Sequence, residues 1–239
     1  MTPSANNGGA LPGHAEGNAV GSRVGLQARE QSVVVGLLLG DGGLELSRRG
    51  LARLCVHQHP KRLAYVDWLY EQLARLVKTP PRLSEYYDRR IARATPRYGF
   101  KTLAVPELAE WYHRFYLNGT KRVPEGVGQW LDAVALAVWF ADDGSFKTDS
   151  RGLLLNSNAF PVEDQRRLQA VLLQRFGLQT ALHRLRQWWR IYIPARSTDR
   201  LIDAILPHLS EDLLYKLALT PERLIPYGRD RRIRLPRFR

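Results

Sequence analysis

The 239-residue chain is long enough for one large domain or two small ones, and 44% of its residues are hydrophobic, which is typical of a globular protein. Basic residues outnumber acidic residues 36 to 23, so the formal net charge is +13 and polyanions are the expected partners. Six of the basic residues are lysines and 30 are arginines, whose planar guanidinium suits phosphates and guanine edges. The single cysteine, Cys55, excludes a disulfide framework.

Several sequence features bear on the compartment. No segment reaches the roughly 18 uninterrupted apolar residues of a membrane span, and the N-terminus lacks a charged stretch followed by a hydrophobic core. Cysteine usage suits a reducing compartment. We therefore expect an intracellular, unsecreted protein of a bacterial cytoplasm or an organelle matrix, with no membrane partner. Residues 1–28 are rich in Gly, Ala, Asn and Pro without periodicity and are expected to form a flexible leader.

The first predicted element is a helix that is apolar nearly all round and ends on an acid. Residues 33–46 read VVVGLLLGDGGLEL, in which Asp41 is the carboxylate at the end of the apolar run. The elements predicted after it are a strand, a helix with a 3-4-3 apolar spacing, two extended segments dense in Arg and aromatics, and an amphipathic helix. Their residue ranges are 51–58, 66–76, 82–90, 97–105 and 106–116.

The same order of elements returns in the second half. Residues 131–146 read LDAVALAVWFADDGSF, and Asp143 lies 102 residues after Asp41. A strand, a helix, two extended segments and an amphipathic helix are again predicted, over residues 152–158, 168–176, 180–187, 188–195 and 198–209. A repeat of this length predicts two similar halves, each with helix, hairpin, helix, hairpin and helix.

The two apolar helices lead to a prediction about chemistry. A helix that is apolar all round must be buried, and in pseudo-symmetric halves the two helices most simply bury each other. Asp41 and Asp143 then lie side by side at the negative ends of two helix dipoles, which is unfavourable unless divalent cations bind there. The alternative is that each Asp-Gly pair is only a helix stop followed by a turn.

These residues carry a family resemblance. VVGLLLGDG at 34–42 and LAVWFADDG at 136–144 resemble the paired signature helices of LAGLIDADG homing endonucleases, and the likeness runs from about Ser32 to Leu217. It is closest to the branch whose second copy reads WF-x-DDG. The supporting segments are KRVP at 121–124, IYIP at 191–194 and YKL at 215–217.

The resemblance implies an α+β fold and an activity. It predicts two pseudo-symmetric αββαββ repeats, at 29–125 and 126–227, and a basic tail at 228–239. Each repeat has a curved antiparallel sheet, and the two sheets form a DNA-binding saddle with the signature helices packed at the centre. The implied activity is that of a monomeric, site-specific DNA endonuclease of an intron or intein-like element. It cuts both strands of a long, asymmetric target and leaves 3′ overhangs, with Mg²⁺ as cofactor, Mn²⁺ as a substitute and Ca²⁺ bound without efficient cleavage.

The motif also predicts the metal ligands. Asp41 and Asp143 match its metal-binding acids, and Gly40 and Asp142 match positions whose backbone carbonyls help to hold metal. In the chemistry that follows, metal ions activate a water and stabilise the charge of the transition state.

The sequence departs from the motif at one place. Val138 stands where the second copy would have the glycine that matches Gly36, so the close helix contact is expected to use Ala137 and Ala141 instead.

Further catalytic candidates lie near the acids. Lys121 and Lys216 occupy equivalent places in the repeat and are predicted to steady the transition-state charge, while the alternative for each is a solvated lysine at a helix end. Arg122 is a possible substitute for Lys121. Gln58 and Asn158, at the strand ends nearest the acids, are predicted to bind water or the scissile phosphate.

The hairpins are predicted to read DNA. Arg190 and Tyr192 alternate with Ile191 and Ile193, so one strand face is apolar and the other polar. The same reasoning makes contact candidates of Arg53, Arg82, Tyr86, Arg89, Arg97, Lys101, Lys147, Arg151, Arg184 and Arg186. Half or more of such contacts are expected to reach phosphates rather than bases.

Two alternatives stay open at this point. Cys55, His57 and His59 alternate along a strand and offer three zinc ligands, although a structural zinc site needs a fourth. For the whole protein, the alternative to an endonuclease is a non-cleaving nucleic-acid binder of the same fold, either a maturase that binds its host intron RNA or a DNA-binding regulator. Intact acids in both copies favour cleavage, because a pure binder needs neither.

Overall fold

The computed structural model describes residues 25–89, 92–147 and 150–217 of the chain. Most of the predicted leader and the whole of the predicted basic tail lie outside these residues. Among the described residues, no helix is long and apolar enough to cross a membrane.

The elements of the two halves follow the same order. The first half contains α1 (Ala28–Leu39), β1 (Gly43–Leu46), β2 (Ala52–Gln58), α2 (Leu63–Gln72), β3 (Arg82–Asp88), β4 (Arg93–Lys101), α3 (Pro106–Phe115), β5 (Tyr116–Leu117) and β6 (Thr120–Lys121). The second half contains α4 (Ala133–Asp143), β7 (Gly144–Phe146), β8 (Leu153–Leu155), α5 (Val162–Phe176), β9 (Ala181–Leu185), β10 (Trp188–Ile193) and α6 (Ala195–Ile205), followed by 3₁₀ turns at Leu206–His208 and Glu211–Leu217.

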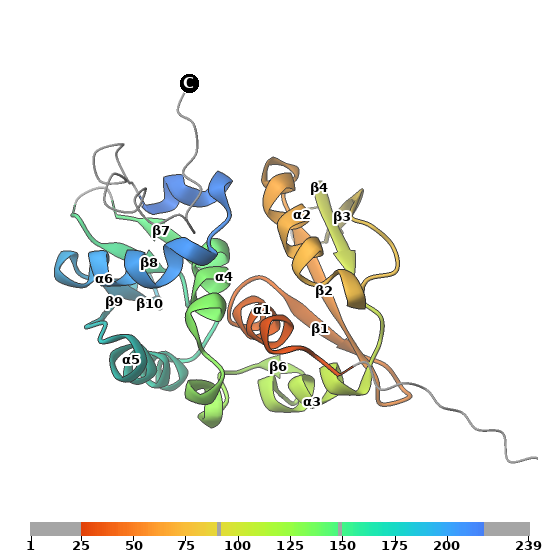
Figure 1. Ribbon diagram of the computed structural model, residues 1–239, viewed down its shortest axis with the longest axis horizontal. Coiled ribbons are helices and arrows are strands. Elements are labelled where there is room, and N and C mark those ends of the chain that lie inside the picture. The colour runs from red at the N-terminus through yellow and green to blue at the C-terminus, as the bar shows by residue number, and fades with distance from the viewer. Residues whose placement is uncertain (1–24, 90–91, 148–149, 218–239) are drawn as a thin grey trace, which may run out of the picture.

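Each half forms one antiparallel four-stranded sheet. The strand orders are β1-β2-β4-β3 and β7-β8-β10-β9, so the second sheet repeats the connections of the first. Figure 1 shows α1 and α4 next to each other in the middle of the molecule, with one repeat on either side of them. The predicted α+β class with two αββαββ repeats is therefore confirmed.

The central helices are buried and run in the same direction. At their N-terminal ends the Ser32 hydroxyl donates a hydrogen bond to Asp132, the N-cap of α4, over 2.6 Å. Halfway along, a Cβ atom on Gly36 would lie only 2.6 Å from the Cβ of Val138, so a larger residue at 36 has no room. Val138 thus packs directly on Gly36, and the valine that departs from the motif lies in the helix contact, while Ala137 and Ala141 are also buried.

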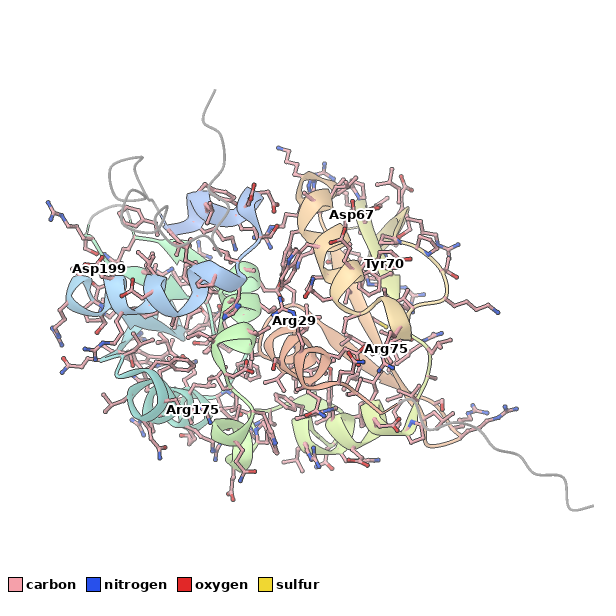
Figure 2. All side chains as sticks on the ribbon, viewed as in Figure 1. Arg29, Asp67, Tyr70, Arg75, Arg175 and Asp199 are labelled. Atoms are coloured by element: carbon pink, nitrogen blue, oxygen red, sulfur yellow. The ribbon has the colours of Figure 1, made fainter. Side chains whose placement is uncertain are left out.

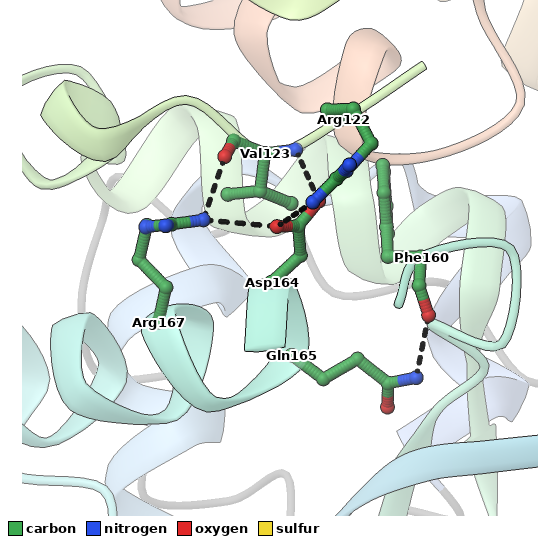
Figure 3. A network of polar contacts seen from close by, with 6 residues as sticks. All are labelled: Arg122, Val123, Phe160, Asp164, Gln165 and Arg167. Carbon is green, nitrogen blue, oxygen red and sulfur yellow. Dashed lines mark hydrogen bonds and ion pairs between the residues drawn. The ribbon is translucent and has the colours of Figure 1, made fainter. Parts of the chain in front are cut away.

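An ion-pair network joins the segment between the repeats to the start of α5 (Figure 3). Asp164 is 1% exposed and accepts hydrogen bonds from Arg122 Nε at 2.8 Å, the Val123 N–H at 2.9 Å and Arg167 Nη1 at 3.0 Å. Burial alone would raise the pKa of Asp164, but these donors outweigh it and lower the pKa. The network fixes the chain where it passes from the first repeat to the second.

Polar contacts also tie α1 to α2 on the outer side of the first repeat. Arg75 Nε donates to the buried carboxylate of Glu30 over 3.0 Å, and Arg29 Nε donates to Gln72 over 2.5 Å. Figure 2 shows Arg29 on α1 and Arg75 beyond the end of α2. These contacts hold the outer end of α1 while its other end carries the acid.

Several elements differ from their predicted bounds. The strand predicted over 152–158 covers only Leu153–Leu155, and the helix predicted over 198–209 spans Ala195–Ile205. The helix predicted over 66–76 ends at Gln72, and the last apolar position, Leu76, belongs to a separate 3₁₀ turn. The amphipathic helix predicted over 106–116 ends at Phe115, where the short hairpin β5–β6 begins. Asn118 and Gly119 form its two-residue turn with φ of 50° and 76°, the conformation that an Asn-Gly pair favours.

Candidate active site

The two acid-bearing helix ends are joined by hydrogen bonds between the repeats. The Asp41 backbone N–H donates to Asp142 Oδ2 at 2.9 Å. The Gln58 side-chain amide donates to Asp41 Oδ2 at 2.9 Å and to Asp142 Oδ1 at 3.1 Å. The Tyr65 hydroxyl donates to the same Asp142 Oδ1 at 3.0 Å. Three donors from the first repeat therefore hold a carboxylate that belongs to the second.

Strand alternation explains how Gln58 reaches this position. The buried residues of β2 are Ala52, Leu54, Val56 and Gln58, whereas the residues between them are exposed or half-buried. Gln58 thus follows the core-facing side of the strand and meets the helix ends rather than the open face of the sheet. Its Oε1 in turn accepts a hydrogen bond from Arg62 over 3.1 Å.

The lysines of both repeats contact backbone carbonyls at the helix ends. Lys121 Nζ donates to the oxygens of Gly40 at 2.8 Å and Gly42 at 2.7 Å. Lys216 Nζ donates to the oxygens of Ala141 at 2.5 Å and Asp142 at 3.0 Å. An ammonium group is a cation, so each helix end presents oxygen atoms that bind positive charge.

The second acid has a different environment from the first. Asp41 is exposed, whereas Asp143 is half-buried. The Asn156 amide donates to the backbone oxygen of Asp143 over 2.9 Å and accepts from Arg190 Nη1 at 3.5 Å. Asn158, which the sequence suggested for this place, makes no hydrogen bond within the part of the chain that the structure describes.

Burial and mutual repulsion raise the pKa of the two acids of α4. Burial and the charge of Asp41 raise the pKa of Asp142 to about 8 and that of Asp143 to about 7, although Lys121 and Lys216 oppose the second shift. Burial and the nearby Arg62 lower the pKa of Lys216 to about 8, and burial lowers the pKa of Lys121. A divalent cation among these oxygens would favour the carboxylate forms and release protons.

A comparison with known sequences identifies the family. Residues 31–201 match the LAGLIDADG DNA endonuclease family, a span that covers most of the chain. The chain belongs to this family.

Relatives and a solved structure are consistent with this assignment. The chain is 28% identical over 209 residues to the DNA endonuclease I-ChuI of Chlamydomonas applanata, covering 81% of this chain and 96% of that protein. It is 26% identical over 190 residues to the cytochrome b mRNA maturase bI2 of Debaryomyces hansenii, covering 77% and 72%. The homing endonuclease I-WcaI bound to its DNA recognition sequence superimposes with a TM-score of 0.74 at 22% identity, over 82% of this chain and 88% of that one, which supports the fold. Assignment to the WF-x-DDG branch stays a prediction.

The LAGLIDADG fold places most of the predicted DNA-contact residues of the first repeat on one face of its sheet. The register pairs Glu45 with Arg53, Cys55 with Lys101, and Arg97 with Ser84, so these side chains share the face opposite the core. Arg82 and Tyr86 lie on the same face of β3, and Arg89 follows that strand in a turn. We call this the first groove face, and its residues are Gly43, Glu45, Arg53, Cys55, His57, Arg82, Ser84, Tyr86, Asp88, Arg93, Thr95, Arg97, Gly99 and Lys101.

The corresponding face of the second sheet is more apolar. Arg190 and Tyr192 lie on it as predicted, because Ile191 and Ile193 are fully buried on the other side. Arg184 pairs with Trp189, which lies on the same face of β10 as Ile191 and Ile193. Arg184 therefore lies on the opposite face of the sheet from Arg190. Lys147 and Arg151 lie between β7 and β8, and Arg186 lies in the β9–β10 turn with φ of 55°.

The zinc hypothesis does not fit the geometry. His59 leaves the alternation of β2 because it caps the 3₁₀ turn Pro60–Arg62, where its Nδ1 accepts from the Lys61 N–H. Within the described ranges, no three His, Cys, Asp or Glu side chains are grouped as a metal site. A metal at the acids would therefore need backbone carbonyls as well as carboxylates.

The sequence did not single out Tyr65, Arg62 or Asn156. Tyr65 lies one residue before the helix predicted over 66–76, and only the structure shows its hydroxyl at Asp142. Asn156 directly follows β8 and lies two residues before the predicted Asn158. The sequence thus pointed to the end of this strand but to the wrong asparagine for the contact with Asp143.

Proposed function

We propose that the protein is a site-specific, double-strand DNA endonuclease that depends on divalent metal ions. The observation that carries this proposal is the convergence of Asp41, Asp142 and Asp143 at the ends of two parallel helices, with a lysine at each end. Burial and mutual repulsion raise the pKa of Asp142 and Asp143, so these carboxyl groups destabilise the folded protein increasingly as the pH rises above about 4. Such a cost is expected at a functional site rather than at a helix stop.

The residues suit a divalent metal such as Mg²⁺. Asp41 and Asp143 supply carboxylate oxygens, and Gly40 and Asp142 supply carbonyl oxygens, which are the hard ligands that Mg²⁺, Mn²⁺ and Ca²⁺ prefer. When bound, such a metal lowers the pKa of a coordinated water and stabilises charge on the phosphate.

The residues of the chain have distinct parts in the proposed reaction. Gln58 orients the Asp41 carboxylate through its 2.9 Å hydrogen bond. Lys121 and Lys216 bring positive charge to the two helix ends, and the carbonyl oxygens that they contact would be available as ligands to a bound metal. The first groove face, with its arginines, holds the phosphates of the duplex. One acid for each strand accounts for double-strand cleavage, and the resemblance suggests staggered 3′ ends.

The test is a cleavage assay on supercoiled plasmid. The plasmid carries the DNA that flanks the coding sequence in its genome, rejoined as an uninterrupted site. Linear product should appear with Mg²⁺ and disappear with EDTA, and a plasmid without the site should stay supercoiled. Binding without any cleavage in Mg²⁺ or Mn²⁺ would contradict the proposal.

A second candidate function rests on the similarity to a maturase. The relative from Debaryomyces hansenii is named an mRNA maturase, so a non-cleaving RNA binder is the alternative. Filter binding with the flanking intron RNA and with the rejoined DNA site separates the two. An RNA bound more tightly than the DNA, together with no cleavage, favours the maturase.

A further inference from the structure

The first groove face carries an acid where a DNA-binding surface is expected to be basic. Arg53, Lys78, Arg82, Arg97 and Lys101 line a hollow of about 470 Å³ along this face. Glu45 lies beside them on β1, four residues after Asp41. Next to the phosphates of a duplex, an added carboxylate lowers affinity, since it repels them and offsets the cations that bind them.

Glu45 is held by two neighbours. Its Oε2 accepts from Arg53 Nε at 2.8 Å and lies 2.7 Å from Arg53 Nη2, and its Oε1 accepts from Lys101 Nζ at 2.8 Å. The hydrogen bonds from Lys101 and Arg53 lower the pKa of Glu45 to about 2. Glu45 and Arg53 are directly opposite each other in the register, so both side chains project into the groove together.

Stability does not explain this arrangement. The side chain of Glu45 is 48% exposed, that of Arg53 46% and that of Lys101 36%. Ion pairs this exposed contribute only about 0–1 kcal/mol. Glu45 therefore adds little stability and is expected to weaken binding to DNA phosphates. Discrimination between base pairs would explain its place on this face.

The chemistry of the pair selects one base pair. Arg donates to guanine O6 and N7 in the major groove, and Glu accepts from the amino group of cytosine. Arg53 uses Nε and one N–H of Nη2 on Glu45, which leaves guanidinium donors for guanine. We propose that Glu45 and Arg53 together make the protein select a G·C base pair at the position that faces β1 and β2, with Lys101 holding the carboxylate in place.

This inference rests on the proposed function, because it requires a specific duplex. The test measures binding in Ca²⁺ to the rejoined insertion-site duplex and to every single-base-pair variant of it. One G·C position should be preferred by about tenfold, the size that a good side chain–base contact supplies. Glu45→Gln should reduce that preference to less than about threefold and leave the other positions unchanged. It should also tighten binding to an unrelated duplex, because one anion has left the surface.

Glu110→Gln is the matched control. Glu110 pairs with Arg114 on α3 over 3.6 Å and is also exposed, so the change removes the same charge from an ion pair away from the groove face. It should leave the base preferences intact. Glu45→Ala should act like Glu45→Gln, and thermal unfolding shows whether each variant is folded.

Three results would overturn the inference. They are an unchanged preference in Glu45→Gln, an equal loss at all positions, and a loss at an A·T position. Wild-type protein that discriminates no duplex would instead contradict the proposed function itself.

Discussion

The two repeats present different surroundings to equivalent acids. Asp41 is exposed, and its carboxylate accepts a hydrogen bond from Gln58. Asp143 is half-buried, and Asn156 contacts its backbone oxygen rather than its carboxylate. The first acid is thus held by its side chain and the second by its main chain. A pseudo-symmetric fold can therefore contain two chemically unequal sites.

The two sheets also differ, in the side chains that their faces opposite the core carry. Four cations of the first groove face line one hollow together with Lys78, whereas the corresponding face of the second sheet carries a ring stack, with the centroids of His183 and Tyr192 4.1 Å apart. Trp188 and Leu185 form an exposed cross-strand pair on that second face. We expect the first sheet to contribute more of the phosphate binding and the second to contribute more of the apolar contact with bases.

Removing the acids gives the largest expected effect. Asp41→Asn or Asp143→Asn keeps the shape but removes a charge that the proposed function assigns to metal binding, so cleavage of one strand should fall by about 10³-fold. Each single variant should accumulate nicked plasmid, and the double variant should give no product while it still binds DNA. Linear product from the double variant would show that both acids are only helix stops.

Replacing the lysines tests whether each acid site depends on the lysine at its own helix end. Lys121→Met and Lys216→Met should each slow cleavage by about 10²-fold, on opposite strands, since each removes one positive charge from a helix end of the proposed site. Both lysines also lower the pKa of Asp143, so either loss should move the rising arm of the pH–rate profile to higher pH. Lys61→Met, an exposed change beyond β2, is the control. Equal slowing of both strands by one variant would argue against separate sites.

Replacing Tyr65 tests whether the hydrogen bonds around Asp142 serve the site of Asp41 more than that of Asp143. Tyr65→Phe removes one donor from Asp142, which accepts the Asp41 N–H, and the loss of a buried hydrogen bond costs about 1–3 kcal/mol. The strand assigned to Asp41 should be cut about tenfold more slowly relative to the other, as measured on duplexes labelled on either strand.

A matched change at a hydroxyl that does not contact the acids controls for stability. Tyr98→Phe removes a similar hydroxyl, which donates to Asp67 over 2.8 Å. It should leave the ratio between the strands unchanged. A Tyr65→Phe protein with the wild-type ratio would mean that the hydroxyl serves stability alone.

The last prediction concerns pH and stability without metal, and it bears on folding rather than on cleavage. The raised pKa of Asp142 means that the folded protein keeps a proton that the unfolded chain has released. Stability should therefore fall as pH rises from about 4 to about 8, on the order of 1 kcal/mol per pH unit, and level off above that range. Asp142→Asn should flatten this slope in urea unfolding with EDTA, whereas Asp203→Asn, at an exposed position on α6, should not. An unchanged slope in Asp142→Asn would assign the effect to other groups.

Much of the fold follows from sequence because its signals are periodic. The apolar helices, the alternation of residues 190–193 and the 102-residue repeat each specify an element or a pairing. The position of Tyr65 does not follow, since its hydroxyl contacts the other repeat and the predicted helix began one residue later. The face of Arg184 does not follow either, because it depends on the register of β9 with β10, which the sequence alone does not fix.

The contact between Gly40 and Asp142 bears on whether the halves are interchangeable. A Cβ atom on Gly40 would lie 2.6 Å from the Cβ of Asp142, so the carboxylate fits only because its neighbour has no side chain. A molecule built from two first halves would place glycine against glycine and lose the acceptor of the Asp41 N–H. One built from two second halves would force two carboxylates into the space of one. The halves of this chain form a matched pair, in which the residue at either position restricts which side chain the other position can hold.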